Sequence, residues 1–267
     1  MTLQQTFILG ILQGVTEFIP VSSSGHLLLF PFLFGWDVQP TAFDIVVHIG
    51  TLAALLIYFR KKLFLLLRNS IELVHQKKTT SLKNSLAVKI AIGTLPAIFV
   101  GALFTEIINE TFKSPLIASL SLITIGILFL VPERLWKSSK VDLKEISTKD
   151  SIIIGLFQVL AFIRGTSRSG ITILGGLVRG LTREQATEFS FLLGIPIIAL
   201  AGAYELININ ELLQIGIPTI LVGLTSSFLS GYLAITFMMK FVKKHGLLIF
   251  GVYRIILGII VITTTIR

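Results

Sequence analysis

Long apolar segments alternate with short charged segments along the whole chain. Six of the apolar segments carry few charges and approach the roughly 20 helical residues that cross a hydrocarbon core of about 30 Å. They are residues 41–59, 89–108, 114–132, 187–204, 215–237 and 246–266. This pattern predicts an all-α membrane protein with about six transmembrane helices.

Two further apolar segments, 1–36 and 151–180, are each interrupted by a polar run. The first contains Pro20–Gly25 (PVSSSG), and the second contains Arg164–Gly170 (RGTSRSG). The pieces on either side of each run are marginal or too short to cross a bilayer. Because non-helical backbone at membrane depth must be covered by protein or water, we interpret each segment as a re-entrant helical hairpin with a polar tip. A single broken span is the alternative for the first segment.

Composition agrees with a polytopic membrane protein made of one integral domain, residues 1–267. The chain is 53% hydrophobic and 14% charged, with a mean hydropathy of +0.88, whereas a soluble globular domain is about 25% charged. There is no cysteine, which excludes disulfides and thiolate metal sites. The net charge of +9 falls in loops, as it does in membrane proteins. We therefore predict a lipid bilayer and no nucleic acid as partner. The oligomeric state stays open, a homodimer included.

The basic segments indicate the orientation. If the segment 151–180 enters and leaves the membrane on the same side, all the basic loops share one face. By the positive-inside rule this face is cytoplasmic. These loops are 60–89, 133–150, 179–183 and 240–245. The links 109–114 and 205–214, with Glu110, Glu205 and Glu211, then lie outside, as do both termini. Treating both hairpins as full spans gives eight spans and scatters the basic loops over both faces, so six spans are favoured.

An internal repeat supports this topology. A shift of 145 residues aligns Gly10–Gln13 with Gly155–Gln158, and it places Ser22 on Ser167, Ser24 on Ser169 and Gly25 on Gly170. A weaker match pairs 96–101 with 218–223. The predicted halves, 1–132 and 151–267, are joined by a cytoplasmic linker, 133–150. Each half holds a hairpin and three spans, and because the hairpins enter from opposite sides the repeat is inverted.

The candidate chemistry begins in the stretch Gln13–His26 (QGVTEFIPVSSSGH). It holds a carboxylate, three consecutive hydroxyls, a glycine and an imidazole, and ionisable groups within apolar segments are functional candidates. The second tip contributes Arg168, which is more tolerable at low dielectric if it lies beside Glu17. Hydroxyls, loop amides and a fixed arginine suit phosphate recognition. A phosphate site beside a base and a nucleophile implies phosphoryl transfer.

Structural explanations stay open for several of these side chains. Glu17 and Arg168 could only join the hairpins, and Ser22, Ser23 and Ser24 could only cap a helix. Gln13 lies on the same helical face as Glu17 and is either a ligand neighbour or a packing residue. The pair Asp44 and His48 belongs either to the site or to a structural contact. We interpret Arg254 as a residue that snorkels or pairs locally.

The segments QGVTEFIPVSSSGH and GTSRSGIT resemble the undecaprenyl-diphosphate phosphatase family, the bacitracin-resistance type. The resemblance extends over FDIVVHIGTLAAL, GTLPA and EFSFLLGIP, nearly the whole chain. It implies hydrolysis of undecaprenyl diphosphate to the monophosphate and phosphate, which recycles the lipid carrier of peptidoglycan synthesis. It also implies a bacterial plasma-membrane enzyme, an inverted repeat with re-entrant hairpins, a divalent cation, and resistance to bacitracin when the enzyme is abundant.

The family's motifs fall on definite residues of this chain. The acidic motif falls on Gln13 and Glu17, the tentative metal ligands, and the hydroxyl–histidine motif falls on Ser22, Ser23, Ser24 and His26. The catalytic residues expected from the resemblance are Glu17, Ser23, His26 and Arg168. The expected substrate-binding residues are Ser22, Ser24, Gly25, Arg164, Thr166, Ser167, Ser169, Gly170 and Thr172.

This chain departs from the family pattern at two positions. Gln13 brings no charge, so a Mg²⁺ or Ca²⁺ ion would be held by Glu17, substrate oxygens and water. The family's Pro-Gly-x-Ser-Arg-Ser-Gly motif falls on Arg164–Gly170. Arg164 replaces its proline and either adds a phosphate contact or loosens the loop.

The mechanism stays open at this point. Ser23 or His26 attacks the terminal phosphorus, or His26 assists a direct attack by water, and Glu17 orients or deprotonates the attacking group. The first hairpin opens outward, so we expect a site that faces outside. The rival function is a polyprenyl-phosphate transporter or flippase, since paired broken helices are a transporter architecture. The nucleophile and base beside the arginine favour an enzyme, because binding alone does not need them.

Overall fold

The computed structural model describes residues 1–111, 114–131, 143, 146–205 and 214–265. These residues form helices and connecting loops and contain no β-strand, in agreement with the predicted all-α class. In chain order the helices are α1 (Leu3–Phe18), α2 (Ser23–Phe34), α3 (Thr41–Tyr58), α4 (Arg60–His75), α5 (Thr79–Lys83), α6 (Leu86–Thr111), α7 (Pro115–Leu130), α8 (Thr148–Val159), the 3₁₀ turn η3 (Leu160–Phe162), α9 (Arg168–Val178), α10 (Arg183–Glu205), α12 (Ile217–Phe241) and α13 (Leu248–Thr265).

Four of the described helices are long and apolar enough to cross a bilayer, namely α3, α6, α10 and α12. The protein is therefore a multi-pass membrane protein. The two other predicted spans correspond to two apolar helices outside this group of four, namely α7 with 16 residues and α13, whose apolar part is Leu248–Thr264. Most of the predicted linker 133–150, part of the link 109–114 and most of the link 205–214, with Glu211, lie outside the described residues, as do the side chains of Glu110 and Glu205.

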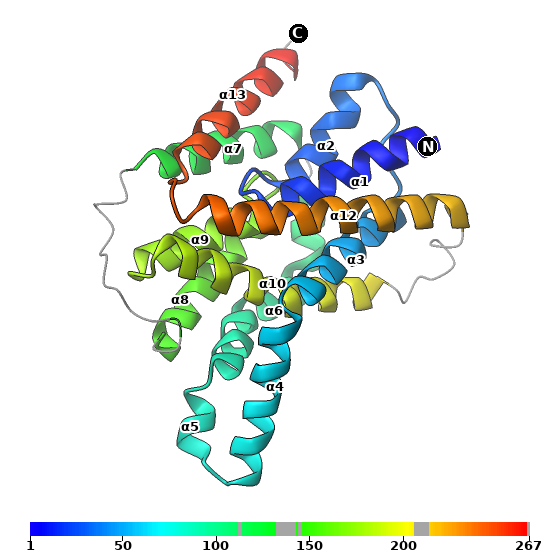
Figure 1. Ribbon diagram of the computed structural model, residues 1–267. Coiled ribbons are helices and arrows are strands. Elements are labelled where there is room, and N and C mark those ends of the chain that lie inside the picture. Colours follow the sequence, from blue (N-terminus) through cyan, green and yellow to red (C-terminus); the bar gives the residue numbers. More distant parts are fainter. Residues whose placement is uncertain (112–113, 132–142, 144–145, 206–213, 266–267) are drawn as a thin grey trace.

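The helices pack in pairs that are far apart in sequence. Figure 1 shows α12 running across the middle of the molecule, with α1 and α3 against it and α7 beside α13 at the top. Gly14 of α1 faces the backbone of α12 at Ser227 and Gly231, where any side chain at position 14 would collide. Small residues allow this close approach when no hydrophobic force drives helices together in lipid.

The two interrupted segments begin in the same way. Thr2 and Gln5 form a capping box at the start of α1, and Ser147 and Asp150 form one at the start of α8. Such reciprocal bonds satisfy backbone amides that a helix leaves unpaired.

Asp150 also joins the beginning of the second interrupted segment to its end. Its carboxylate accepts a 2.6 Å bond from Arg179, just after α9 ends. Burial raises the pKa of Asp150, but hydrogen bonds from Ser147 and Arg179 outweigh it and hold that pKa below its usual value.

The core joins both segments. Phe18 at the end of α1 is fully buried and contacts Phe191 of α10 edge to face, with ring centroids 5.4 Å apart. Edge-to-face contacts of this kind add to the stabilisation from burial. The end of α1 is thereby fixed next to α10, where the second polar tip also packs.

The basic connection 60–89 is largely helical. It forms α4 and α5, which project from the rest of the molecule at the bottom of Figure 1. We refer to these two helices, with the turn between them, as the arm.

Candidate functional site

Both polar tips end in a serine with an uncommon backbone conformation. Ser22 has φ 78° and Ser167 has φ 72°, and each precedes a helix, α2 or α9. Each hydroxyl accepts a hydrogen bond of 3.2 Å from the amide of the glycine three residues later, Gly25 or Gly170. A non-glycine residue at positive φ costs about 1–3 kcal/mol and persists where the surroundings enforce it. The two tips are therefore built alike, each with a helix start at its end.

The carboxylate of Glu17 lies where the two tips meet. Its Oε1 accepts a bond of 2.6 Å from Nη2 of Arg168, and its Oε2 accepts one of 2.6 Å from the hydroxyl of Ser23. The amide nitrogen of Gln13 donates a longer bond of 3.2 Å to Oε2. Glu17 is 7% exposed and Arg168 is 12% exposed. The ion pair expected between the two segments is present, and it also holds a serine hydroxyl.

Arg168 is held flat against α10. Its Nη1 donates to the backbone carbonyl of Ser190 at 3.3 Å. The guanidinium lies over Gly194, where a Cβ atom would overlap it. Gly194 was not singled out by the sequence, because nothing in its local pattern reveals which side chain lies above it.

His26 has two partners that keep it apart from this cluster. Its Nδ1 lies 2.7 Å from the carbonyl oxygen of Ser22, so this nitrogen carries the proton and donates. Its Nε2 lies 2.7 Å from the hydroxyl of Tyr253 on α13, with the two rings nearly parallel. Within the described part of the chain, no hydrogen bond or ion pair joins His26 to Glu17 or Arg168.

The remaining hydroxyls line the tips. Ser24 lies 3.4 Å from Ser22, and Ser169 lies 3.2 Å from Ser167, oxygen to oxygen. Thr166 bonds with Ser121 of α7, and Thr172 bonds with Ser190 of α10. The two threonines are buried in contacts between helices.

Arg164, Asp44 and His48 differ in their relation to the cluster. Arg164 is half-buried and makes no hydrogen bond or ion pair with any residue that the structure describes. The carboxylate of Asp44 accepts from Gln39, whereas Nε2 of His48 lies 4.0 Å from Oε2 of Glu17. His48 therefore stands at the edge of the cluster and Asp44 does not touch it.

The structure contradicts the interpretation of Arg254 as a snorkelling residue. Arg254 is fully buried, and its guanidinium donates to Pro20 in the first tip at 3.1 Å and to Gly165 and Thr166 in the second tip at 2.6 and 2.9 Å. Its Nε also donates a longer bond of 3.4 Å to Leu122 of α7. All four acceptors are backbone carbonyls, and among the described residues no carboxylate pairs with Arg254. The signal that could have revealed its role was its charge within an apolar helix.

The residues beside Glu17 fit a hard cation in part. Oε1 of Gln13 is buried without a hydrogen-bond partner, although the amide nitrogen of the same side chain bonds Glu17. Oxygen atoms are the ligands that Mg²⁺ and Ca²⁺ prefer. The described residues contain no cluster of three or more histidine or acidic side chains arranged for a metal. The chain would therefore supply two oxygen ligands, and substrate and water would supply the others.

A bundle of apolar helices that joins a carboxylate, a hydroxyl and a guanidinium between its two tips is a polytopic membrane protein with a polar cluster in its interior. The family model described as "Bacitracin resistance protein BacA" matches residues 6–260, and the chain belongs to this family.

Curated relatives align along almost their whole length. A protein named "Undecaprenyl-diphosphatase" from Chloroherpeton thalassium is 40% identical, over 97% of this chain and 95% of the relative. "Undecaprenyl-diphosphatase 2" from Stutzerimonas stutzeri is 41% identical, over 98% of both chains. An "Undecaprenyl-diphosphatase" from Nitrosococcus oceani is 44% identical, over 94% of both chains.

Proposed function

We propose that this protein hydrolyses undecaprenyl diphosphate to undecaprenyl phosphate and inorganic phosphate. This reaction recycles the lipid carrier for peptidoglycan synthesis, and an abundant enzyme confers bacitracin resistance by removing the diphosphate lipid. Membership of the family and the names of the relatives support the activity. The observation that carries it is the carboxylate of Glu17, which is bonded at once to the hydroxyl of Ser23 and to the guanidinium of Arg168.

Substrate binding follows from this ion pair. In the free protein Arg168 and Glu17 neutralise each other in a buried setting. Phosphate oxygens compete for the guanidinium, which matches their geometry, and the polar tips add the hydroxyls of Ser22, Ser24, Ser167 and Ser169. Once Arg168 turns to the diphosphate, Glu17 loses its cationic partner and becomes a better base.

The chemical steps use Ser23 as the nucleophile. Its Oγ attacks the terminal phosphorus while its proton passes to Glu17, and the bond from that phosphorus to the bridging oxygen breaks. Glu17 returns the proton to the departing undecaprenyl phosphate. Water, deprotonated by Glu17, then attacks the phosphoserine, and Ser23 regains the proton as phosphate leaves. Arg168 stabilises the charge that develops on the phosphoryl oxygens.

Two groups assist these steps in the proposal. A divalent cation, Mg²⁺ or Ca²⁺, would be held by Glu17 and Gln13, and when bound it supplies charge neutralisation for the diphosphate oxygens. His26 keeps the start of α2 in place, because its ring joins the Ser22 carbonyl to Tyr253. Among the described residues Arg164 makes no hydrogen bond or ion pair, although the carboxylate of Asp44 lies within its electrostatic reach, and in the proposal Arg164 turns to the incoming anion.

The architecture of the proposal is an inverted repeat with two re-entrant hairpins, 1–36 and 151–180, in the halves 1–132 and 151–267. The matched capping boxes and the matched tip serines, each pair 145 residues apart, support it. The positive charge of the arm and of the linker sequence supports a cytoplasmic face on their side of the membrane. The protein then lies in the bacterial inner membrane with its site open to the outer face.

The deciding experiment is phosphate release from undecaprenyl diphosphate by detergent-purified protein, with and without chelator. Glu17→Gln should abolish release, whereas Glu72→Gln, which changes an exposed acid of α4 that pairs with Arg68, should retain it. No release by folded wild-type protein would refute the hydrolase and leave lipid transport as the remaining function.

A rapid-quench experiment with labelled substrate tests the nucleophile. Label on Ser23 supports covalent catalysis, and protein that stays unlabelled during turnover points to direct attack by water.

A further inference from the structure

The arm carries an apolar surface that no other described part of the chain covers. Helix α4 has no buried residue. By contrast, α3, which only Phe59 separates from α4, is half buried within the protein. Figure 1 shows the arm projecting away from the other helices. A solvated helix in this position would be expected to carry polar side chains on its outer sides.

The outer side of α4 is instead strongly apolar. Phe64, Leu67, Ile71 and Val74 follow the helical repeat and share one face, and they are 57–64% exposed. We call these four residues the α4 stripe. The neighbouring face, with Leu63 and Leu66, packs against the main hydrophobic core. The stripe is thus additional to the apolar surface that α4 needs for its own packing.

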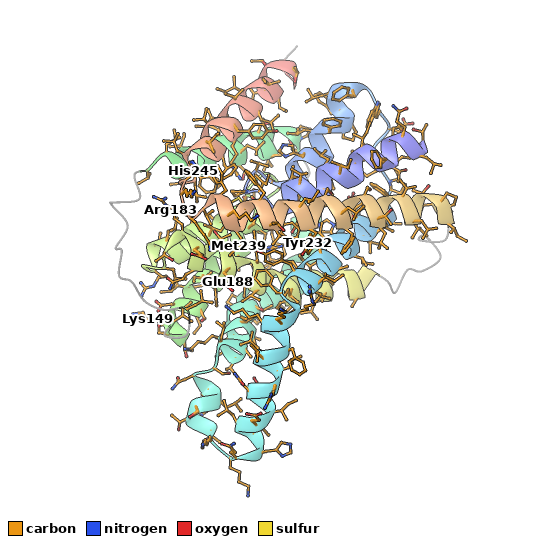
Figure 2. All side chains as sticks on the ribbon, viewed as in Figure 1. Lys149, Arg183, Glu188, Tyr232, Met239 and His245 are labelled. Carbon is orange, nitrogen blue, oxygen red and sulfur yellow. The ribbon has the colours of Figure 1, made fainter. Side chains whose placement is uncertain are left out.

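Cationic side chains border the stripe. Residues 60–83 contain seven lysines and arginines and one acid, Glu72. Glu72 is paired with Arg68, and Lys62 is paired with Glu188 of α10, which Figure 2 labels near the centre of the molecule. Within the described residues, Lys61, Lys77, Lys78 and Lys83 have no ion pair. The arm therefore combines an apolar face with unneutralised positive charge.

We propose that the α4 stripe lies in the surface of an anionic membrane leaflet, with the lysines of the arm at the headgroups. Two observations select a lipid surface as the partner. The stripe is continuous with a membrane-spanning helix, because α4 begins directly after α3 and Phe59. An apolar stripe flanked by lysine and arginine is the pattern of helices that bind in the interface of anionic bilayers. The short link also prevents α4 from moving far from the bilayer.

The chain suits a direct test because it contains no cysteine. Ile71→Cys places a fluorescent label in the stripe, and Asn69→Cys places the same label on the opposite, exposed side of α4. Full-length protein is reconstituted into phosphatidylcholine vesicles with or without phosphatidylglycerol. Brominated phosphatidylcholine quenches a label in the bilayer, and iodide quenches a label in water.

The proposal expects the label at position 71 to be quenched by brominated lipid and shielded from iodide, and the label at position 69 to behave in the opposite way. Phosphatidylglycerol should strengthen the difference. Lys61→Gln, Lys77→Gln and Lys78→Gln should each weaken the docking equilibrium roughly fivefold. Iodide quenching at both positions, or no effect of phosphatidylglycerol, would overturn the proposal. Shielding of position 71 from both quenchers would also overturn it, because protein, such as a second copy of the chain, would then cover the stripe.

Discussion

Gly194 lies directly beneath the guanidinium of Arg168, so closely that no side chain could stand between them. The arginine therefore reaches Glu17 across the surface of α10 rather than through open space. A residue with no functional group of its own thus leaves the space in which the guanidinium of Arg168 lies.

Gly194→Ala should reduce kcat/KM about a hundredfold, since the new methyl group displaces a charged donor that the transition state needs. The unfolding temperature should fall less than in a variant that removes Arg168, because the guanidinium shifts at the end of a flexible side chain and its charge stays near Glu17. Gly202→Ala on the same helix is the control, as the atom nearest to its added methyl group is 3.8 Å away. If the Gly194→Ala variant turned over substrate at the wild-type rate, the contact with Gly194 would not be what positions Arg168.

Removal of one member of the Glu17–Arg168 pair should destabilise the protein as well as inactivate it. Arg168→Met leaves the buried carboxylate of Glu17 without its cation, at a cost of about 3–5 kcal/mol. The double variant Glu17→Gln with Arg168→Met should recover much of the thermal stability and none of the turnover. Unfolding temperatures and phosphate release, measured on Arg168→Met, Glu17→Gln and the double variant, separate the two roles. Equal unfolding temperatures for single and double variants would contradict the coupling.

Ser23→Ala should lower kcat about a thousandfold or more, as expected when a nucleophile bonded to its base is removed. Ser24→Ala should raise KM and keep most of kcat, because the hydroxyl of Ser24 contacts Ser22 and not Glu17. Steady-state kinetics on both variants makes the comparison. A similar loss of kcat in the two would place the attacking oxygen elsewhere.

Arg254→Lys keeps the positive charge but loses the planar fork that reaches both tips. We expect kcat to fall about a hundredfold, since displacement of reacting groups by about 1 Å has that effect. Arg68→Lys on the exposed arm serves as the control. A lower unfolding temperature with unchanged kcat would restrict Arg254 to a packing role.

Gln13→Glu adds a second carboxylate beside Glu17 and should strengthen metal binding, since affinity follows the charge of the ligand set. The Mg²⁺ concentration for half-maximal turnover should fall about tenfold. Gln13→Leu, which removes the unpaired Oε1, should raise it. Titration of Mg²⁺ into chelator-treated protein gives both values. Identical titration curves for the wild type and the two variants would show that Gln13 does not contribute to the metal site.

Local patterns predicted the apolar helices, the breaks at Pro20–Gly25 and Arg164–Gly170, and the attraction between Glu17 and Arg168. These features follow from hydropathy, from helix-breaking residues and from the cost of a buried lone charge. The partners of Arg254 were not predictable in this way, because they are backbone carbonyls 88–234 positions away, and any residue can supply a carbonyl. The same holds for the contact between His26 and Tyr253, which depends on how α13 packs.

The position of Arg254 also orders the life of a newly made chain. Helix α13 follows every other described helix, so the ribosome delivers Arg254 after the residues of both tips. Until then the carbonyls of Pro20 and Gly165 lack their shared donor, although Arg168 of the second tip can already pair with Glu17. A chain that has not yet received its last helix therefore lacks a donor that bridges the two tips, and the contacts that fix the tips against each other become complete only with α13.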